Sequence, residues 1–266
     1  MKPRSAGFTL AEMAIVLLVV GLLLTSVLST VSTQVEARNI AETQSRLSLI
    51  KDALTGFAQA NGRLPCPADG TLATGATGAG LEEVTGNICK TPATRYAVLP
   101  WATLGVAETD VWGRRFSYVV DVNFADAYAA LSWGAGCTPS PAPASPTSFA
   151  LCSPGTLAVK TRTAANKTGT SVSNIPLVII SHGRNGYGAY TPDGTQFAAP
   201  PAVNADETAN TPAAALTTFY SREQSPQADS CSDTAAGSNF CEFDDLVAYI
   251  PVSVLVTRMV SAGRLP

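Results

Sequence analysis

Proline is almost missing from the first quarter of the sequence. Of the 18 prolines in the 266 residues, only Pro3 comes before Pro65. Proline removes a backbone donor and breaks the interior of a helix, so residues 4–64 are where a long helix is possible. The proline-rich remainder predicts short elements joined by many turns.

Histidine is equally scarce, because His182 is the only one in the chain. Nucleophilic catalysis needs a base beside the nucleophile, and Ser181 would point to the opposite face of a strand from His182. Neither a Gly-x-Ser-x-Gly elbow nor a phosphate-cradling glycine loop occurs. We therefore expect no enzyme, and we interpret His182 as a hydrogen-bonded turn residue.

Charge is sparse too, with a net charge of −3 and no basic run. Phosphate backbones are bound through clustered Lys and Arg, so we do not expect nucleic acid as a partner. Cysteine is missing before residue 66, and the six later cysteines lack the two-residue spacing of zinc or redox pairs. Their number indicates an oxidising compartment. Many pairings are possible, and loop closure favours sequence neighbours: Cys66 with Cys89, Cys137 with Cys152, and Cys231 with Cys241.

An unbroken apolar run occupies residues 13–24 and, with its flanks, supplies the roughly 20 residues that a membrane helix needs. Lys2 and Arg4 precede the run and the next basic residue is Arg38, so the N-terminus is expected in the cytoplasm and the bulk outside. A cleaved secretory signal with a cut near residues 35–37 is the alternative. Glu12 argues against it, because a charge inside an apolar segment is costly.

Thr9 and Glu12 have the spacing of a capping box, which explains part of the position of Glu12. The string from Gly7 to Glu12, after a short basic leader, also resembles the class III leader of type IV pilins and type II secretion pseudopilins. The resemblance implies that prepilin peptidase cuts between Gly7 and Phe8 and methylates the Phe8 amine. It also implies that Glu12 pairs with the Phe8 amine of a neighbouring subunit. Ser29 stands where major subunits usually carry proline, which favours a minor subunit.

Beyond the apolar run the helix is expected to continue to about Ala60, since Asn61, Gly62 and Pro65 form a stop signal. One apolar face recurs at helical spacing: Ile40, Leu47, Ile50, Leu54 and Phe57. This face is expected to cover the sheet of the outer domain.

Strands are expected, mainly antiparallel, at residues 96–99, 115–122, 157–160, 177–181 and 246–257. Low-complexity loops at 70–80 and 139–146 interrupt them. The string Asp110–Tyr118 is similar to the Asp-Pro-Trp-Gly strand motif of major pseudopilins, and Ser181–Gly186 resembles the glycine turn after their next core strand. Alternation along the first string predicts that three aromatic residues face the core: Trp112, Phe116 and Tyr118.

The predicted fold is α+β and pilin-like, with a long N-terminal helix packed on an antiparallel sheet with disulfide-bonded loops. Its predicted parts are a leader (residues 1–7), a transmembrane and assembly helix (8–32), its amphipathic continuation (33–62) and an extracytoplasmic β-rich domain (63–266).

The predicted function is that of a structural subunit, a minor pilin or pseudopilin of a type IV pilus or type II secretion filament. Its expected partners are other subunits, prepilin peptidase, the inner-membrane assembly platform and the lipid bilayer, with a single pass in the inner membrane and a periplasmic domain. The alternative is an anchored binding or adhesin domain that does not assemble. No cofactor is expected apart from calcium at Glu242, Asp244 and Asp245. The alternative interpretation of these three residues is a solvated acidic loop.

Overall fold

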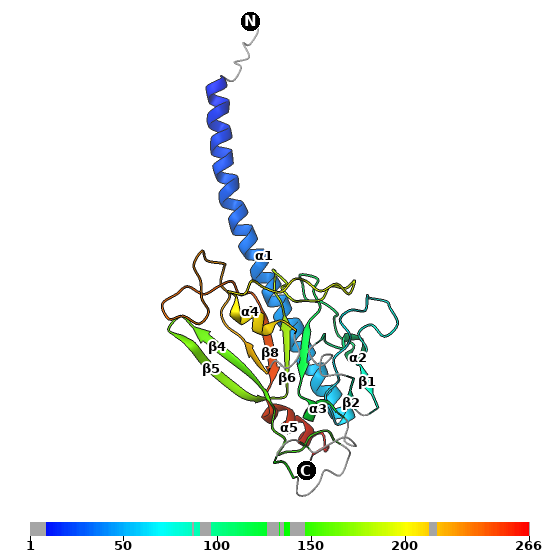
Figure 1. The fold of residues 1–266 in the computed structure, drawn as a ribbon. Helices are drawn as coiled ribbons and strands as arrows, with labels where there is room; N and C mark the ends of the chain where they lie inside the picture. Colours follow the sequence, from blue (N-terminus) through cyan, green and yellow to red (C-terminus); the bar gives the residue numbers. More distant parts are fainter. Residues whose placement is uncertain are drawn as a thin grey trace. The chain divides into compact units, whose positions relative to one another are not determined.

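The computed structural model describes residues 9–86, 88–90, 97–126, 133, 136–138, 147–212 and 217–265 (Figure 1). Two units make up the chain, Met1–Glu42 and Thr43–Pro266. The predicted long helix is present as α1, Leu10–Asn61. It ends at the expected stop signal, because Gly62 adopts a φ of 72° and donates its N–H to the carbonyl of Ala58 at 2.8 Å. The predicted leader and the loop at residues 139–146 lie outside the described residues.

Three antiparallel strands form the central sheet in the order β3-β6-β8, with β3 at Ser117–Val120, β6 at Leu177–Ser181 and β8 at Leu246–Ile250. The middle strand β6 is buried along its whole length. Its side chains alternate between the two faces of the sheet, so two different hydrophobic clusters share this one strand.

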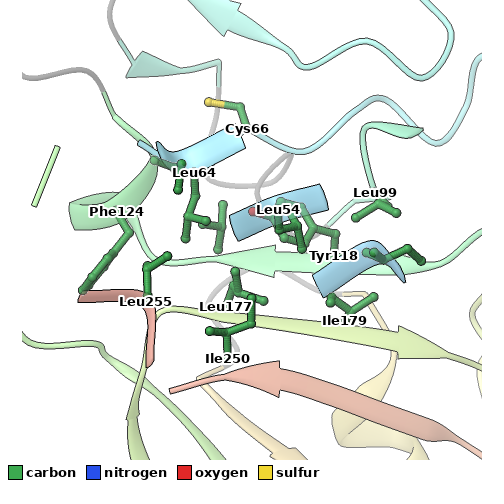
Figure 2. Packing of buried hydrophobic residues seen from close by; sticks show 14 of the residues in the cluster. Leu54, Leu64, Cys66, Leu99, Tyr118, Phe124, Leu177, Ile179, Ile250 and Leu255 are labelled. Atoms are coloured by element: carbon green, nitrogen blue, oxygen red, sulfur yellow. The ribbon is translucent and has the colours of Figure 1, made fainter. Parts of the chain in front are cut away.

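One face of this sheet packs against the second half of α1. Figure 2 shows Leu54 of α1 beside Tyr118 of β3, with Leu177 and Ile179 of β6 and Ile250 of β8 in the same cluster. The buried helix residues are Thr43, Leu47, Ile50, Leu54 and Ala58. The predicted apolar face is thus confirmed at Leu47, Ile50 and Leu54. Phe57 is only half-buried, because the helical period of 3.6 residues places Ala58 against the sheet instead.

A second sheet covers the other face, with strand order β5-β4-β7 (Figure 1). Its strands are β4 (Leu157–Thr163), β5 (Asn166–Ile175) and β7 (Thr218–Tyr220). Leu157, Val159, Ile175 and Phe219 of this sheet pack on the outer face of β3 and β6. The predicted antiparallel pairing is confirmed for β3, β6 and β8 and for β4 with β5, whereas β7, which was not predicted, runs parallel to β4. A short hairpin, β1 (Val84–Thr85) and β2 (Ile88–Cys89), completes the strands of the described residues.

Two predicted strands were too long. Residues 115–122 contain only β3, because Asp121 accepts the N–H of Asn123 at 2.8 Å and begins the short helix α3, Val122–Ala125. Residues 246–257 contain β8 and then Pro251, after which helix α5 runs from Val252 to Ser261. Leu255 and Met259, four residues apart, are fully buried, so a helical spacing was misread as a strand.

The remaining short helices are α2 (Trp101–Leu104) and α4 (Ala205–Asn210). The predicted strand at 96–99 is reduced to Val98, which bridges Ala68 and Ser117, while Tyr96 lies outside the described residues. Trp112 is half-buried in a turn and does not belong to a strand, so the predicted aromatic alternation holds only for Phe116 and Tyr118.

The loop at residues 70–80 is held by a buried cation. Arg115 is fully buried and donates from Nη1 to the carbonyls of Gly70 and Leu72 at 2.9 and 2.7 Å. Its charge is paired with Glu108, whose Oε1 lies 2.7 Å from Nη2. This low-complexity sequence is therefore a fixed part of the fold.

All three cysteine pairings predicted by loop closure are present: Cys66–Cys89, Cys137–Cys152 and Cys231–Cys241. The bridges close loops over sequence separations of 23, 15 and 10 residues. Each loop contains little regular structure, so the bridge supplies order that packing alone does not.

Candidate functional site

The N-terminal end of α1 begins with a complete capping box. The carboxylate of Glu12 accepts, through Oε2, the N–H and the hydroxyl of Thr9, both at 2.8 Å. In return, the N–H of Glu12 donates to the Oγ1 of Thr9 at 3.3 Å. The second carboxylate oxygen, Oε1, has no hydrogen-bond partner among the described residues. Gly7 and Phe8, the predicted cleavage residues, lie outside the described part of the chain.

The turns of α1 that follow the capping box carry apolar side chains on all sides. Between Leu10 and Leu22 the large hydrophobic side chains are 44–89% exposed. Such a helix has no polar face to turn toward water, unlike the amphipathic helix of a soluble globule. Within the part of the chain that the structure describes, no helix meets the length and apolarity required to cross a membrane.

Two strings singled out in the sequence meet in the unit Thr43–Pro266. Asp110, at the start of the first string, is buried, and its Oδ2 accepts the hydroxyl of Ser181 from the second string at 2.7 Å. Its Oδ1 accepts the backbone N–H groups of Trp112 and Arg114 at 3.0 and 2.9 Å. Burial raises the pKa of Asp110. Gly186 adopts a φ of 69°, and a Cβ there would collide with Arg114. The left-handed backbone at this position favours glycine, and its missing side chain leaves room for Arg114.

His182 is buried and hydrogen-bonded, as expected of a turn residue that packs inward. Its Nε2 lies 2.8 Å from the Oγ of Ser117, and its Nδ1 lies 3.6 Å from the Oδ1 of Asp245. The residue types are those of a nucleophile, a base and an orienting acid. However, Ser117 and His182 are each only 1% exposed, so a substrate has no path to the hydroxyl. Ser117 and His182 share a buried hydrogen bond, whereas Asp245 lies just beyond hydrogen-bond distance of the imidazole.

Three carboxylates gather beside this histidine. Glu207 of α4 and the consecutive Asp244 and Asp245 before β8 each place one oxygen within 4.8 Å of the other two. Of the three acidic residues singled out in the sequence, two belong to this group; Glu242 does not, and Glu207 completes it. Burial, followed by the charge of Asp245, raises the pKa of Glu207 to about 7. Burial is also the main cause that raises the pKa of Asp244 to about 7.

The cluster of three carboxylates has few hydrogen-bond donors to offset its charge. Asn185 donates its side-chain amide to Glu207 at 2.9 Å and its backbone N–H to Asp244 at 2.8 Å. Asn210 donates to Asp245 at 2.8 Å. The other oxygen of Asp244, Oδ1, is buried and has no hydrogen-bond partner. A buried carboxylate oxygen without a donor is costly, and a hard cation could satisfy it.

A buried ion-pair network fixes α4 beneath this cluster. Arg222 donates from Nε to Asp206 at 2.9 Å and from Nη2 to Asp233 at 3.1 Å. Arg162 reaches the other oxygen of Asp206 at 2.6 Å. Asp233 in turn accepts the N–H of Cys241 at 3.1 Å. The network therefore ties the Cys231–Cys241 loop to the helix that carries Glu207.

Sequence reasoning missed Ser117 and Glu207. Ser117 lies within a string that was singled out for its aromatic residues, and its contact with His182 depends on the pairing of β3 with β6. Glu207 lies 37 residues before Asp244 in the sequence. Neither contact has a local signal, because both arise from strand pairing and helix docking.

Residues 2–28 match a family model described as the prokaryotic N-terminal methylation motif. The matched segment includes Gly7, Phe8, Thr9 and Glu12. Comparison with curated proteins found no match. Comparison with solved structures also found none. The matched motif and the capping box of Thr9 and Glu12 lead to one conclusion: the N-terminal segment of this chain is similar to that of prepilin-type proteins, the type IV pilins and pseudopilins.

Proposed function

We propose that the protein is a minor structural subunit of a type IV pilus or a type II secretion filament. Prepilin peptidase cuts the chain between Gly7 and Phe8 and methylates the new Phe8 amine. The observation that carries this proposal is the match of residues 2–28 to the N-terminal methylation motif. Ser29, at the position where major subunits usually carry proline, favours a minor subunit.

In this proposal the first half of α1 is the anchor and the assembly element. Before assembly, the subunit lies in the inner membrane with its N-terminus in the cytoplasm and the unit Thr43–Pro266 in the periplasm. The inner-membrane assembly platform then adds it to the filament. The exposed apolar side chains between Leu10 and Leu22 support this role. In lipid, or among neighbouring subunits, such a surface is removed from water.

Glu12 has a defined part in assembly. Its Oε2 is occupied by the capping box, whereas Oε1 has no partner among the described residues. We assign Oε1 to the methylated Phe8 amine of a neighbouring subunit. An ion pair in a medium of low dielectric is specific, since either charge left alone there is strongly unfavourable.

N-terminal sequencing of the mature protein tests the processing step. The expected result is a methylated Phe8; a start near residue 38 contradicts the proposal and indicates an ordinary secretory signal.

Assembly is tested by Glu12→Ala, with Glu36→Ala in the same helix as the matched control. Glu12→Ala should be processed normally yet be absent from sheared filaments, whereas Glu36→Ala should be incorporated. Normal incorporation of Glu12→Ala rules out the assembly role and favours an anchored binding domain.

We also propose that Glu207, Asp244 and Asp245 hold a calcium ion. The unpartnered Oδ1 of Asp244 and the three clustered carboxylates support this assignment, because calcium prefers such oxygen ligands. The ion would neutralise the cluster and fix the loop before β8 to α4. No catalytic step is assigned to it.

The calcium proposal is tested by thermal unfolding in EDTA, in Ca²⁺ and in Mg²⁺. Calcium at about one hundred times its Kd should stabilise the protein by about 2.7 kcal/mol. The increase should disappear in Asp244→Asn and persist in the exposed control Asp229→Asn. An equal melting temperature in EDTA and in calcium excludes the site.

A further inference from the structure

Strand β8 is an edge strand with one side left open. It pairs with β6 through five register positions, from Leu246 to Ile250. Among the described residues, no backbone hydrogen bond reaches its other side. An open edge presents a row of unpaired N–H and C=O groups, which natural proteins usually cover or interrupt. The first four residues of β8 are half-buried, so this edge is neither fully exposed nor satisfied.

The open edge lines a groove whose second wall is α1. A hollow of about 420 Å³ lies between Tyr249 and Pro251 on one side and Gly56 on the other. A second hollow of about 320 Å³ lies between Leu246 and Gln44. Lys51 lines both hollows, so they follow one another along the same helix face.

The dimensions of the groove suit an extended peptide. On the helix side, the lining residues run from Gln44 to Gln59, about 22 Å at the helical rise. On the strand side, they run from Asp245 to Pro251, about 20 Å at the rise of an extended chain. A segment of six or seven residues, roughly 20 Å long when extended, therefore fits the groove.

Charge and space indicate the chemistry of the occupant. Lys51 and Arg258 both line the larger hollow, and neither side chain has an ion pair or hydrogen bond within the described part of the protein; Asp52 is the one carboxylate there. A Cβ added to Gly56 would meet nothing within 4 Å. The fold itself therefore does not require this glycine, although glycine costs a helix about 1 kcal/mol. The groove is open and carries an excess of positive charge.

We propose that an extended, carboxylate-bearing segment of a partner protein adds to β8 as a fourth strand of the central sheet. Backbone hydrogen bonds to the open edge supply the affinity, as in other cases of β-strand addition. Carboxylates on the segment pair with Lys51 and Arg258, and α1 covers the added strand. This proposal is independent of the role of Glu12, because the groove lies wholly within residues 43–266.

Hydrogen exchange of the full-length protein in detergent tests the proposal. The probe is the peptide acetyl-Thr-Val-Glu-Val-Glu-Val-Thr-amide, compared with the same peptide carrying lysine in place of glutamate. The glutamate peptide should slow exchange of residues 245–251 by about tenfold or more, because exchange requires the pairing to open. The lysine peptide should leave the exchange rate of these residues unchanged.

Two variants locate the site. Gly56→Leu fills the groove and should abolish protection, while its melting temperature stays equal or rises because a helix glycine has been removed. Ser45→Leu places the same side chain on α1 outside the groove and should retain protection. Lys51→Glu combined with Arg258→Glu should reverse the preference toward the lysine peptide.

The following results overturn the proposal. They are no protection by either peptide, equal protection by both peptides, and protection that rises with protein concentration in the absence of peptide. The last result would assign the open edge to a second copy of the chain. Retained protection in Gly56→Leu, with the helix intact, also places the peptide elsewhere.

Discussion

The carboxylate of Asp110 and the hydroxyl of Ser181 lie 2.7 Å apart, and this contact joins the turn that precedes β3 to the end of β6. The same carboxylate accepts two backbone N–H groups of its own turn. One buried side chain thus orients the two strings that the sequence singles out.

Asp110→Ala should therefore destabilise the protein strongly. Three donors lose their acceptor, the buried hydroxyl of Ser181 and two part-buried backbone N–H groups, and an unsatisfied buried group costs about 1–3 kcal/mol. We expect a loss of about 3 kcal/mol or more in the free energy of unfolding measured with urea. Ser181→Ala should lower the free energy of unfolding by less, and Asp229→Ala, at an exposed position, should hardly change it. A loss below about 1 kcal/mol for Asp110→Ala contradicts the assigned role.

Leu54→Ala tests the contact of α1 with the central sheet. Leu54 is fully buried in the main hydrophobic cluster, so its truncation leaves a cavity and should cost about 3–4 kcal/mol. Leu49, on the same helix, is 63% exposed, and Leu49→Ala should cost less than about 0.5 kcal/mol. Denaturant unfolding of both variants measures the difference. Equal effects would mean that this helix face does not pack on the sheet.

Arg222→Met tests the buried network under α4. Removing one partner leaves the carboxylates of Asp206 and Asp233 buried without that charge, and breaking a buried pair costs about 3–5 kcal/mol. The loop closed by Cys231 and Cys241 should also become accessible to protease, because Arg222 donates to the carbonyl of Cys241 at 3.1 Å. Limited proteolysis detects this change. An unchanged digestion pattern would mean that the order of this loop does not depend on the ion-pair network.

Stability in EDTA should fall as pH rises from about 5 to about 8. Glu207 and Asp244 have a pKa of about 7 in the folded protein, above their ordinary carboxyl values. The folded state therefore holds these protons more tightly than the unfolded state. Their contribution is fully present below the unfolded pKa values and is lost as pH passes the folded ones.

Each of these two groups contributes a slope of at most about 1.4 kcal/mol per pH unit. The double variant Glu207→Gln with Asp244→Asn should flatten the pH dependence of the melting temperature in this range. The paired control, Asp229→Asn, should keep the slope of the unmodified protein. A slope that survives in the double variant would belong to other groups.

The sequence predicted the features whose causes are local. The long helix followed from the absence of proline and from the stop at Asn61 and Gly62, and all three disulfides followed from loop closure. Strand β6 was predicted with its exact bounds, because a fully buried strand gives an unbroken apolar run.

The features that were missed have causes distant in the sequence. Strand β5 is rich in Thr and Ser and is largely exposed, so it carries little hydrophobic signal. The cluster of three carboxylates forms only because α4 packs beside β8, which brings Glu207 close to Asp244. The strand predicted up to residue 257 was wrong because Val-rich sequences suit both strands and helices, and burial of Leu255 and Met259 decided between them.

The C-terminal segment holds the end of α1. Leu255, Met259 and Leu265 belong to the main hydrophobic cluster, and Arg264 donates to the carbonyls of Gln59 and Ala60 in the last turn of the helix. Segments about 200 residues apart in sequence therefore complete each other. Because a chain is synthesised from its N-terminus, α1 is made early, but its last turn lacks these contacts until residues 252–265 have been made. The unit Thr43–Pro266 can therefore complete its fold only after nearly all of its residues have been made.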